Sequence, residues 1–119
     1  MIRAILMGYG QMGRMIERTI ERSDDFELIG VVEPGLFENL QDVPGHPDVV
    51  IDFSYPGNLE KALSFGVSRG CPLVLGTTGY SSGQLEAIRQ AAGRTAIVHS
   101  SNYSTGVAVL AEALRLIAP

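Results

Sequence analysis

The stretch Ile2-Arg3-Ala4-Ile5-Leu6-Met7-Gly8-Tyr9-Gly10-Gln11-Met12-Gly13 decides the fold of this chain. Its apolar first half is typical of a strand buried in a parallel sheet, and its second half is a G-x-G-x-x-G turn that opens a helical pattern. In this context Gly8 permits a tight turn, Gly10 lets a diphosphate approach the backbone, and Gly13 lets helix and strand pack closely. The free amide groups of the new helix would face the anion. The context favours a dinucleotide site, from Gly8 through Gly13, over a purely structural turn.

Composition predicts one globular domain over residues 1–119, because 45% of the residues are apolar and only 18% are charged. No apolar run is long enough to span a membrane. Met1-Ile2-Arg3 leads directly into a strand, so we expect no secretory leader. A single cysteine excludes an internal disulfide framework and suits the cytoplasm. A net charge of −4 argues against a nucleic-acid surface.

Strand and helix patterns alternate along the rest of the chain. We expect further strands at 27–32, 48–53, 73–75 and 96–99, and a least regular segment at 36–47. Ser54 is expected to cap the second helix, Ser81 and Gln84 to form a capping box for the third, and residues 107–117 to form the last helix. The helix periodicity predicts these inward-facing residues: Met12, Met15, Ile16, Thr19, Ile20, Leu59, Ala62, Leu63, Gly66, Leu85, Ile88 and Ala92.

This alternation predicts an α/β fold with a doubly wound (Rossmann) parallel sheet of five strands. Right-handed crossovers lead us to expect the spatial order 3-2-1-4-5. Ligands of such sheets bind at the carboxyl ends of the strands, where the order reverses. Four loops at that edge hold small or polar residues, more than turns require: the glycine turn and residues 52–55, 76–79 and 101–104.

Glu33 completes the dinucleotide pattern, because it ends the second predicted strand about 20 residues after the glycine turn. An acid at this position accepts hydrogen bonds from the adenosine ribose and repels a 2′-phosphate. Pro34 and Gly35 follow it, with no arginine to receive that phosphate. The sequence therefore favours NADH, with NADPH as the alternative cofactor, while an exposed strand-end acid without a ligand is the other interpretation.

Four ordered stretches resemble the amino-terminal domain of dihydrodipicolinate reductase, or 4-hydroxy-tetrahydrodipicolinate reductase, an oxidoreductase of bacterial lysine and diaminopimelate biosynthesis. The family usually has a glycine turn that is one residue longer, and threonine is common where Ser54 stands. The resemblance covers essentially the whole chain and rests on residues 8–15, 48–54, 76–80 and 101–107.

The resemblance implies a role for each loop in binding the cofactor. The glycine turn would seat the diphosphate and Glu33 would hold the adenosine ribose. Phe53 and Ser54 would line the path of the cofactor. The nicotinamide would lie near backbone groups of Gly76 and Thr78, against a wall formed by Ser101, Asn102 and Tyr103.

The family continues into a carboxy-terminal domain that binds and protonates a dicarboxylate substrate, and that segment is absent from these 119 residues. We therefore expect this chain to bind dinucleotide without turning over substrate. The full-length protein would reduce 4-hydroxy-tetrahydrodipicolinate to tetrahydrodipicolinate as a homo-oligomer, with no nucleic-acid or membrane partner. The alternatives are the cofactor domain of another NAD(P)-dependent dehydrogenase and a stand-alone dinucleotide-sensing module.

We expect no catalytic residue and no metal site in this chain. His99 ends the fifth predicted strand, but a lone histidine there is more often structural. Cys71 begins a strand at the opposite edge and is expected to be buried and inert. Loop bonding or capping explains Asp52 as well as catalysis does. The remaining candidates lack a partner or ligand spacing: His46, Asp48, Ser54, Ser81 and Ser104.

Overall fold

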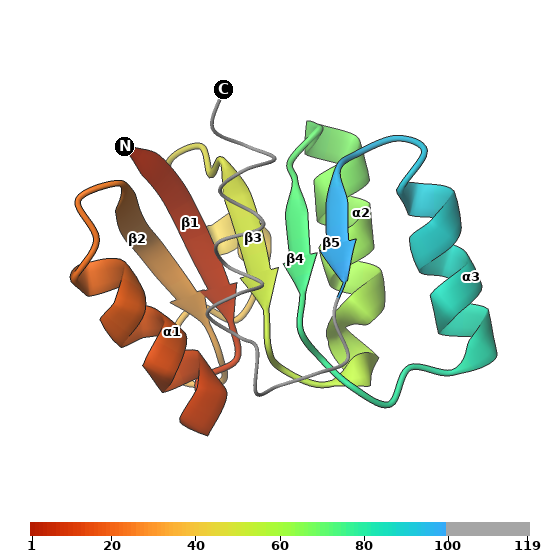
Figure 1. The fold of residues 1–119 in the computed structure, drawn as a ribbon, viewed down its shortest axis with the longest axis horizontal. Coiled ribbons are helices and arrows are strands. Elements are labelled where there is room, and N and C mark those ends of the chain that lie inside the picture. The colour runs from red at the N-terminus through yellow and green to blue at the C-terminus, as the bar shows by residue number, and fades with distance from the viewer. Residues whose placement is uncertain (100–119) are drawn as a thin grey trace.

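A parallel five-stranded sheet forms the centre of the molecule (Figure 1). The structure, a computed structural model, describes residues 1–99. Continuous apolar runs form the strands because both faces of the sheet are covered. In chain order they are β1 (Ile2–Met7), β2 (Phe26–Val32), β3 (Val49–Asp52), β4 (Leu73–Leu75) and β5 (Ile97–His99).

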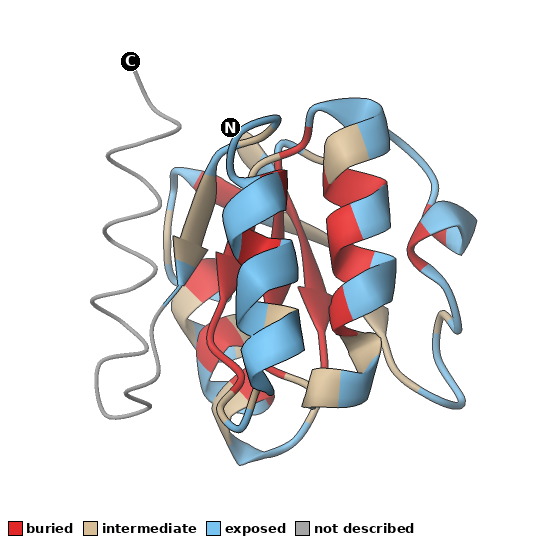
Figure 2. Ribbon diagram, turned by 90° about the vertical axis from the view of Figure 1, so that its right-hand side faces the viewer, coloured by how far each residue is buried: buried red, intermediate tan, exposed pale blue. Residues whose placement is uncertain are grey.

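Helices cover the two faces of this sheet and divide the core into two clusters. Alternation along β1 sends Ala4 and Leu6 to one face, where they pack with Ile16 and Ile20 of α1 (Gln11–Glu21). The opposite face packs against α2 (Leu59–Arg69), α3 (Ser82–Ala91) and the short turn η1 (Leu40–Asp42). Figure 2 shows the buried strands between helices whose outer faces are exposed.

The strand order is 2-1-3-4-5, where the sequence predicted 3-2-1-4-5. This corrects the position of β3, which pairs with β1 and β4 instead of lying at the edge beyond β2. All four residues of β3 are buried, as a central strand requires. A common doubly wound order is 3-2-1-4-5-6, and removing its third strand gives the order seen here. Within the part of the chain that the structure describes, only an isolated bridge between Val32 and Phe37 lies beside β2 in the place of that strand.

Of the two helix starts for which the sequence predicts a capping serine, the structure has the cap at α3 and not at α2. Ser81 and Gln84 form the predicted capping box of α3. The prediction that Ser54 caps α2 is wrong. The short 3-10 turn η2 (Pro56–Asn58) precedes the helix, so Asn58 and not Ser54 is the residue before the first turn of α2. Gly70 ends α2 in the left-handed conformation that favours glycine.

Three residues predicted to face inward lie at the surface. Met15 and Leu85 are 39% and 41% exposed, and Ala92 is exposed while its neighbour Ala91 is buried. α1 and α3 lie at the outside of the molecule. Each therefore buries fewer residues than the whole apolar face that the periodicity predicts. Ile16 and Ile20, in the middle of the inward face of α1, are buried as predicted.

The predicted loop at 101–104 and the predicted helix at 107–117 lie outside the described residues. Across residues 1–99, no helix has the length and apolar character needed to cross a membrane.

Because β3 lies in the centre of the sheet, truncating one of its side chains should lower the free energy of unfolding. Ile51 has no exposed surface, and we expect Ile51→Ala to lower the free energy of unfolding by about 2–5 kcal/mol, because it leaves a cavity in the middle of the sheet. Leu36→Ala is the control, since Leu36 is 54% exposed and its truncation should change stability by about 0.5 kcal/mol or less. Denaturant unfolding measures both, and equal effects would contradict the central placement.

Candidate functional site

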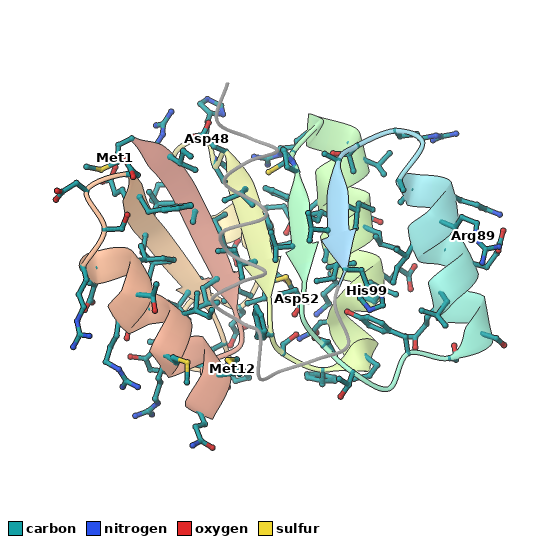
Figure 3. The ribbon with its side chains drawn as sticks, viewed as in Figure 1. Met1, Met12, Asp48, Asp52, Arg89 and His99 are labelled. Carbon is teal, nitrogen blue, oxygen red and sulfur yellow. The ribbon has the colours of Figure 1, made fainter. Side chains whose placement is uncertain are left out.

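The five strands end level with one another at a single edge of the sheet. The pairing register joins the last residues of the strands in one row: Val32, Met7, Asp52, Leu75 and His99. The residues that directly follow this row in the first four strands are Gly8, Glu33, Phe53 and Gly76, all of which the sequence predicted as site residues. Figure 3 shows Met12, Asp52 and His99 toward this edge and Asp48 at the opposite end.

The order of the strands reverses between β1 and β3, so the switch point where ligands bind in such sheets lies there. A groove of about 1080 Å³ opens at this point. It extends from the glycine turn, past the end of β2, and along α2. Six predicted site residues line it: Gly8, Tyr9, Gly10, Glu33, Phe53 and Ser54.

The other predicted site residues have different positions. Gln11, Met12 and Gly13 form the first turn of α1 and do not line the groove. The groove is lined instead by the glycine turn that precedes the helix. Gly76 and Thr78 follow β4 beyond the groove lining. Three lie outside the described residues: Ser101, Asn102 and Tyr103.

Two glycines of the turn are required by the fold itself. Gly8 has a φ of 95°, and a Cβ there would lie 2.7 Å from the carbonyl oxygen of Phe53. A Cβ on Gly13 would lie 2.5 Å from the carbonyl oxygen of Gly8. These contacts hold the start of α1 against β1 and the end of β3, so any side chain at either position would separate the elements that form the groove.

Gly10 differs from both, because the fold does not require glycine there. Its φ of −80° and ψ of −159° are open to any residue. Among residues 1–99, no heavy atom other than those of its chain neighbours lies within 4 Å of the place a Cβ would occupy. This empty space lies at the N-terminus of α1, where no side chain caps the helix and no acidic residue stands in the first turn.

Positive charge lies beside that helix start. The Arg14 guanidinium stacks over the Tyr9 ring at 4.7 Å, and its Nε donates to the Tyr9 carbonyl oxygen at 3.3 Å. The Tyr9 hydroxyl donates to Glu17 at 2.7 Å, and this hydrogen bond is the main cause of the raised pKa of Tyr9. These contacts fix Tyr9 along α1 and keep its hydroxyl protonated and engaged.

Asp52 is completely buried at the end of β3 and organises the loop that follows. Its Oδ1 accepts the Ser54 amide at 2.9 Å and also the Ser54 hydroxyl. Ser54 Oγ in turn accepts Asn58 Nδ2 at 3.1 Å. The Ser54 hydroxyl hydrogen is therefore committed to Asp52, so Ser54 lines the groove without that hydrogen to offer a ligand. Of the interpretations that the sequence left open for Asp52, the structure shows loop bonding.

The second oxygen of Asp52, Oδ2, has no hydrogen-bond partner and no exposed surface among the described residues. Burial raises the pKa of this carboxyl above its ordinary 3.8, while the two hydrogen bonds from Ser54 act in the opposite direction. The carboxylate that holds the loop after β3 is therefore one whose burial disfavours its charged form.

Gly76 has a packing role at this edge. A Cβ at this position would lie 2.1 Å from Phe53 Cε1, so the Phe53 ring occupies the space that a side chain would need. The neighbouring Thr77 is buried, and its hydroxyl donates to the Asp52 carbonyl oxygen at 3.5 Å. The loop after β4 therefore supports the end of β3.

The remaining chemical candidates form no catalytic cluster among residues 1–99. The His99 ring stands 5.4 Å from the Tyr80 ring, a tilted aromatic contact. Cys71 is buried, and burial raises the pKa of its thiol to about 11, which makes it a poor nucleophile. His46 and Asp48 are exposed. No group of three potential ligands in this part of the chain could hold a metal ion.

The sequence placed loop 52–55 at this edge but did not predict the groove residues that follow Ser54. Tyr55, Gly57, Asn58 and Lys61 line the side formed by the β3–α2 loop and α2, and the sequence offered one signal: a large aromatic residue three positions after a strand end and two before a glycine.

The fold and the site define a class: a Rossmann-type α/β domain with its groove at the switch point. The family model described as dihydrodipicolinate reductase, N-terminus, matches residues 2–103. The chain belongs to the dihydrodipicolinate reductase family and corresponds to its N-terminal part.

Individual relatives agree with this family. The 4-hydroxy-tetrahydrodipicolinate reductase of an Exiguobacterium strain is 36% identical over 99% of this chain and 48% of its own length. The enzyme of the same name from Stenotrophomonas maltophilia is 48% identical over 69% of this chain and 35% of its own length. The chain spans about half the length of the curated relatives it matches, or less.

A solved structure supports the fold. Dipicolinate-bound dihydrodipicolinate reductase from Paenisporosarcina sp. TG-14 superposes with a TM-score of 0.69 at 21% identity, over 98% of this chain and 53% of that one. The doubly wound α/β fold is therefore confirmed by comparison as well as by the strand pairing.

The buried carboxyl predicts a pH effect on stability. Because the folded-state pKa of Asp52 lies above 3.8, the folded chain binds more protons than the unfolded chain between those two pKa values, and its stability falls as pH rises through that window. We expect Asp52→Asn, which keeps the acceptor for Ser54, to remove this contribution. Denaturant unfolding across pH 3.5–8 would show the wild type losing stability relative to the variant as pH rises from about 4. A constant difference at all pH values would contradict the shift.

Proposed function

We propose that this chain is the cofactor-binding half of a dihydrodipicolinate reductase and binds a nicotinamide dinucleotide, NADH in preference to NADPH. The full-length protein would reduce 4-hydroxy-tetrahydrodipicolinate to tetrahydrodipicolinate. The observation that carries the proposal is Gly10, a glycine that neither the backbone conformation nor any neighbouring atom requires. A diphosphate lying over position 10 explains it.

The residues present fit such a cofactor. The groove volume of about 1080 Å³ slightly exceeds the usual range for ligand pockets, about 300–1000 Å³, which suits an extended dinucleotide. The uncapped first turn of α1 offers amide groups to an anion beside the Arg14 guanidinium. At the other side of the glycine turn, Glu33 lines the groove with a half-buried carboxylate.

Each part of the edge then has a task. Amides of the first turn of α1, Gln11 to Gly13, would bind the diphosphate, and Glu33 would accept hydrogen bonds from the adenosine ribose. Phe53 forms the floor of the groove with Ser54 beside it, and the Gly76–Thr78 loop would pass near the nicotinamide. The wall expected from the sequence on the far side is Ser101, Asn102 and Tyr103.

The bound dinucleotide would supply a hydride, and this chain would orient the ring and exclude water. We propose that the groups that bind and protonate the substrate come from the half of the relatives' length that this chain does not match. On that proposal residues 1–119 bind cofactor without turnover. Mixing the chain with cofactor and substrate, and following NADH absorbance, tests this expectation.

Gly10→Val tests the diphosphate seat. The substitution fits the backbone and the empty space of the free chain, but its side chain would occupy the place of the diphosphate. We expect NADH affinity to fall at least tenfold, about 1.4 kcal/mol, by isothermal titration calorimetry. Gly83→Val is the control, since Gly83 also lies in the first turn of a helix but away from the groove. Unchanged affinity in a folded Gly10→Val chain would sink the proposal.

Glu33→Ser combined with Pro34→Arg tests the cofactor preference. The wild-type turn at 33–37 contains no cation, and its carboxylate would repel a 2′-phosphate. The double substitution removes that repulsion and adds a guanidinium at the end of β2. We expect the ratio of NADPH to NADH affinity to rise, as measured by titrating both cofactors. A ratio that stays the same would place the adenosine ribose elsewhere.

A further inference from the structure

Tyr55 is a large aromatic residue of the groove to which the proposed function assigns no role in binding the cofactor. Its side chain is 60% exposed, yet it lies at the switch point of the sheet, immediately after Ser54. An exposed tyrosine is ordinary on a protein surface. The surroundings of this residue are what single it out.

The backbone around Tyr55 is held from both sides. Its carbonyl oxygen accepts the Asn58 amide at 3.0 Å, and the Asn58 side chain donates to Ser54 Oγ at 3.1 Å. Gln84 Nε2 of α3 donates to the Pro56 carbonyl oxygen at 2.8 Å, across 28 positions of sequence. These bonds hold the backbone that carries the exposed ring.

The ring itself lies against a glycine. A Cβ on Gly57 would stand 2.6 Å from Tyr55 Cε2 and 3.1 Å from Cδ2, so any larger residue at position 57 would displace the ring. The backbone of Gly57 therefore lies close to the Cδ2 and Cε2 atoms of the ring. The exposed remainder faces solvent and the groove, as a stacking surface requires.

The position of Tyr55 relative to Glu33 suits a nucleoside. β2 and β3 flank β1, so their ends stand two strand spacings apart, about 10 Å. Glu33 and Tyr55 both line the groove, on opposite sides of the glycine turn. A ribose bonded to Glu33 can therefore carry its base toward the β3–α2 loop.

We infer that Tyr55 is the stacking platform for the adenine base of the dinucleotide. This inference rests on the proposed function and adds a residue to it. Base–aromatic stacking requires an exposed, oriented π-face and no charge, which is what the Tyr55 ring provides. The hydroxyl is not needed for the contact, so phenylalanine should replace tyrosine without loss.

The test compares Tyr55→Leu with Tyr55→Phe in the same chain. Calorimetry would measure binding of NADH, ADP-ribose and reduced nicotinamide mononucleotide, which lacks the adenosine half. We expect Tyr55→Leu to weaken NADH and ADP-ribose by about tenfold, and to leave the affinity for the mononucleotide unchanged. Tyr55→Phe should bind all three within about twofold of the wild type.

Leu85→Ala is the control for loss of exposed apolar surface, since Leu85 is 41% exposed on α3 and outside the groove. It should bind all three ligands as the wild type does. Thermal unfolding of each variant checks that the fold is intact.

The outcomes separate this inference from the proposed function. A wild-type chain that binds neither NADH nor ADP-ribose overturns both. Normal NADH binding by Tyr55→Leu overturns the stacking role alone and leaves the proposed function standing. Equal weakening of NADH and the mononucleotide also overturns it, because the loop would then act on the whole groove through its structure.

Discussion

The close approach of the glycine turn to the end of β3 is the constraint on which the rest of the structure depends. Gly8 touches the backbone of Phe53, and Gly13 touches the backbone of Gly8, each at a distance that leaves no room for a side chain. These contacts join β1, α1 and β3 into one unit at the point where the strand order reverses. The groove exists because three backbones meet there.

The sequence was sufficient for the elements and insufficient for their order. Apolar runs, Gly70 and the Ser81 capping box predicted strands and helix ends that depend on local interactions. The position of β3 depends on long-range pairing, which the local pattern of the irregular segment at 36–47 does not reveal. That segment holds only the Phe37 bridge where an edge strand would stand, so the strand at 49–52 opens the second half of the sheet.

The same division applies to the site. The sequence predicted the shared edge of the glycine turn, Glu33 and Phe53, because strand ends place these residues there, and all of them line the groove. The sequence offered Tyr55 only as an aromatic member of the 52–55 loop, because the hydrogen bonds from Asn58 and from Gln84 of a distant helix that hold this loop depend on the folded structure. Ser54 was predicted to cap α2, but the buried carboxylate two residues earlier takes its hydroxyl, and no sequence pattern announces that preference.

The starts of α1 and α3 lie at the same edge of the sheet and differ in a way that the fold does not explain. Ser81 and Gln84 close the amide groups of α3, whereas Gly10 leaves those of α1 open. A serine at position 10 would fit the backbone and would gain only a few tenths of a kcal/mol as a cap. Its oxygen would also occupy the space in front of the amides. A helix start that forgoes a small gain and keeps that space empty is what the proposed diphosphate seat requires.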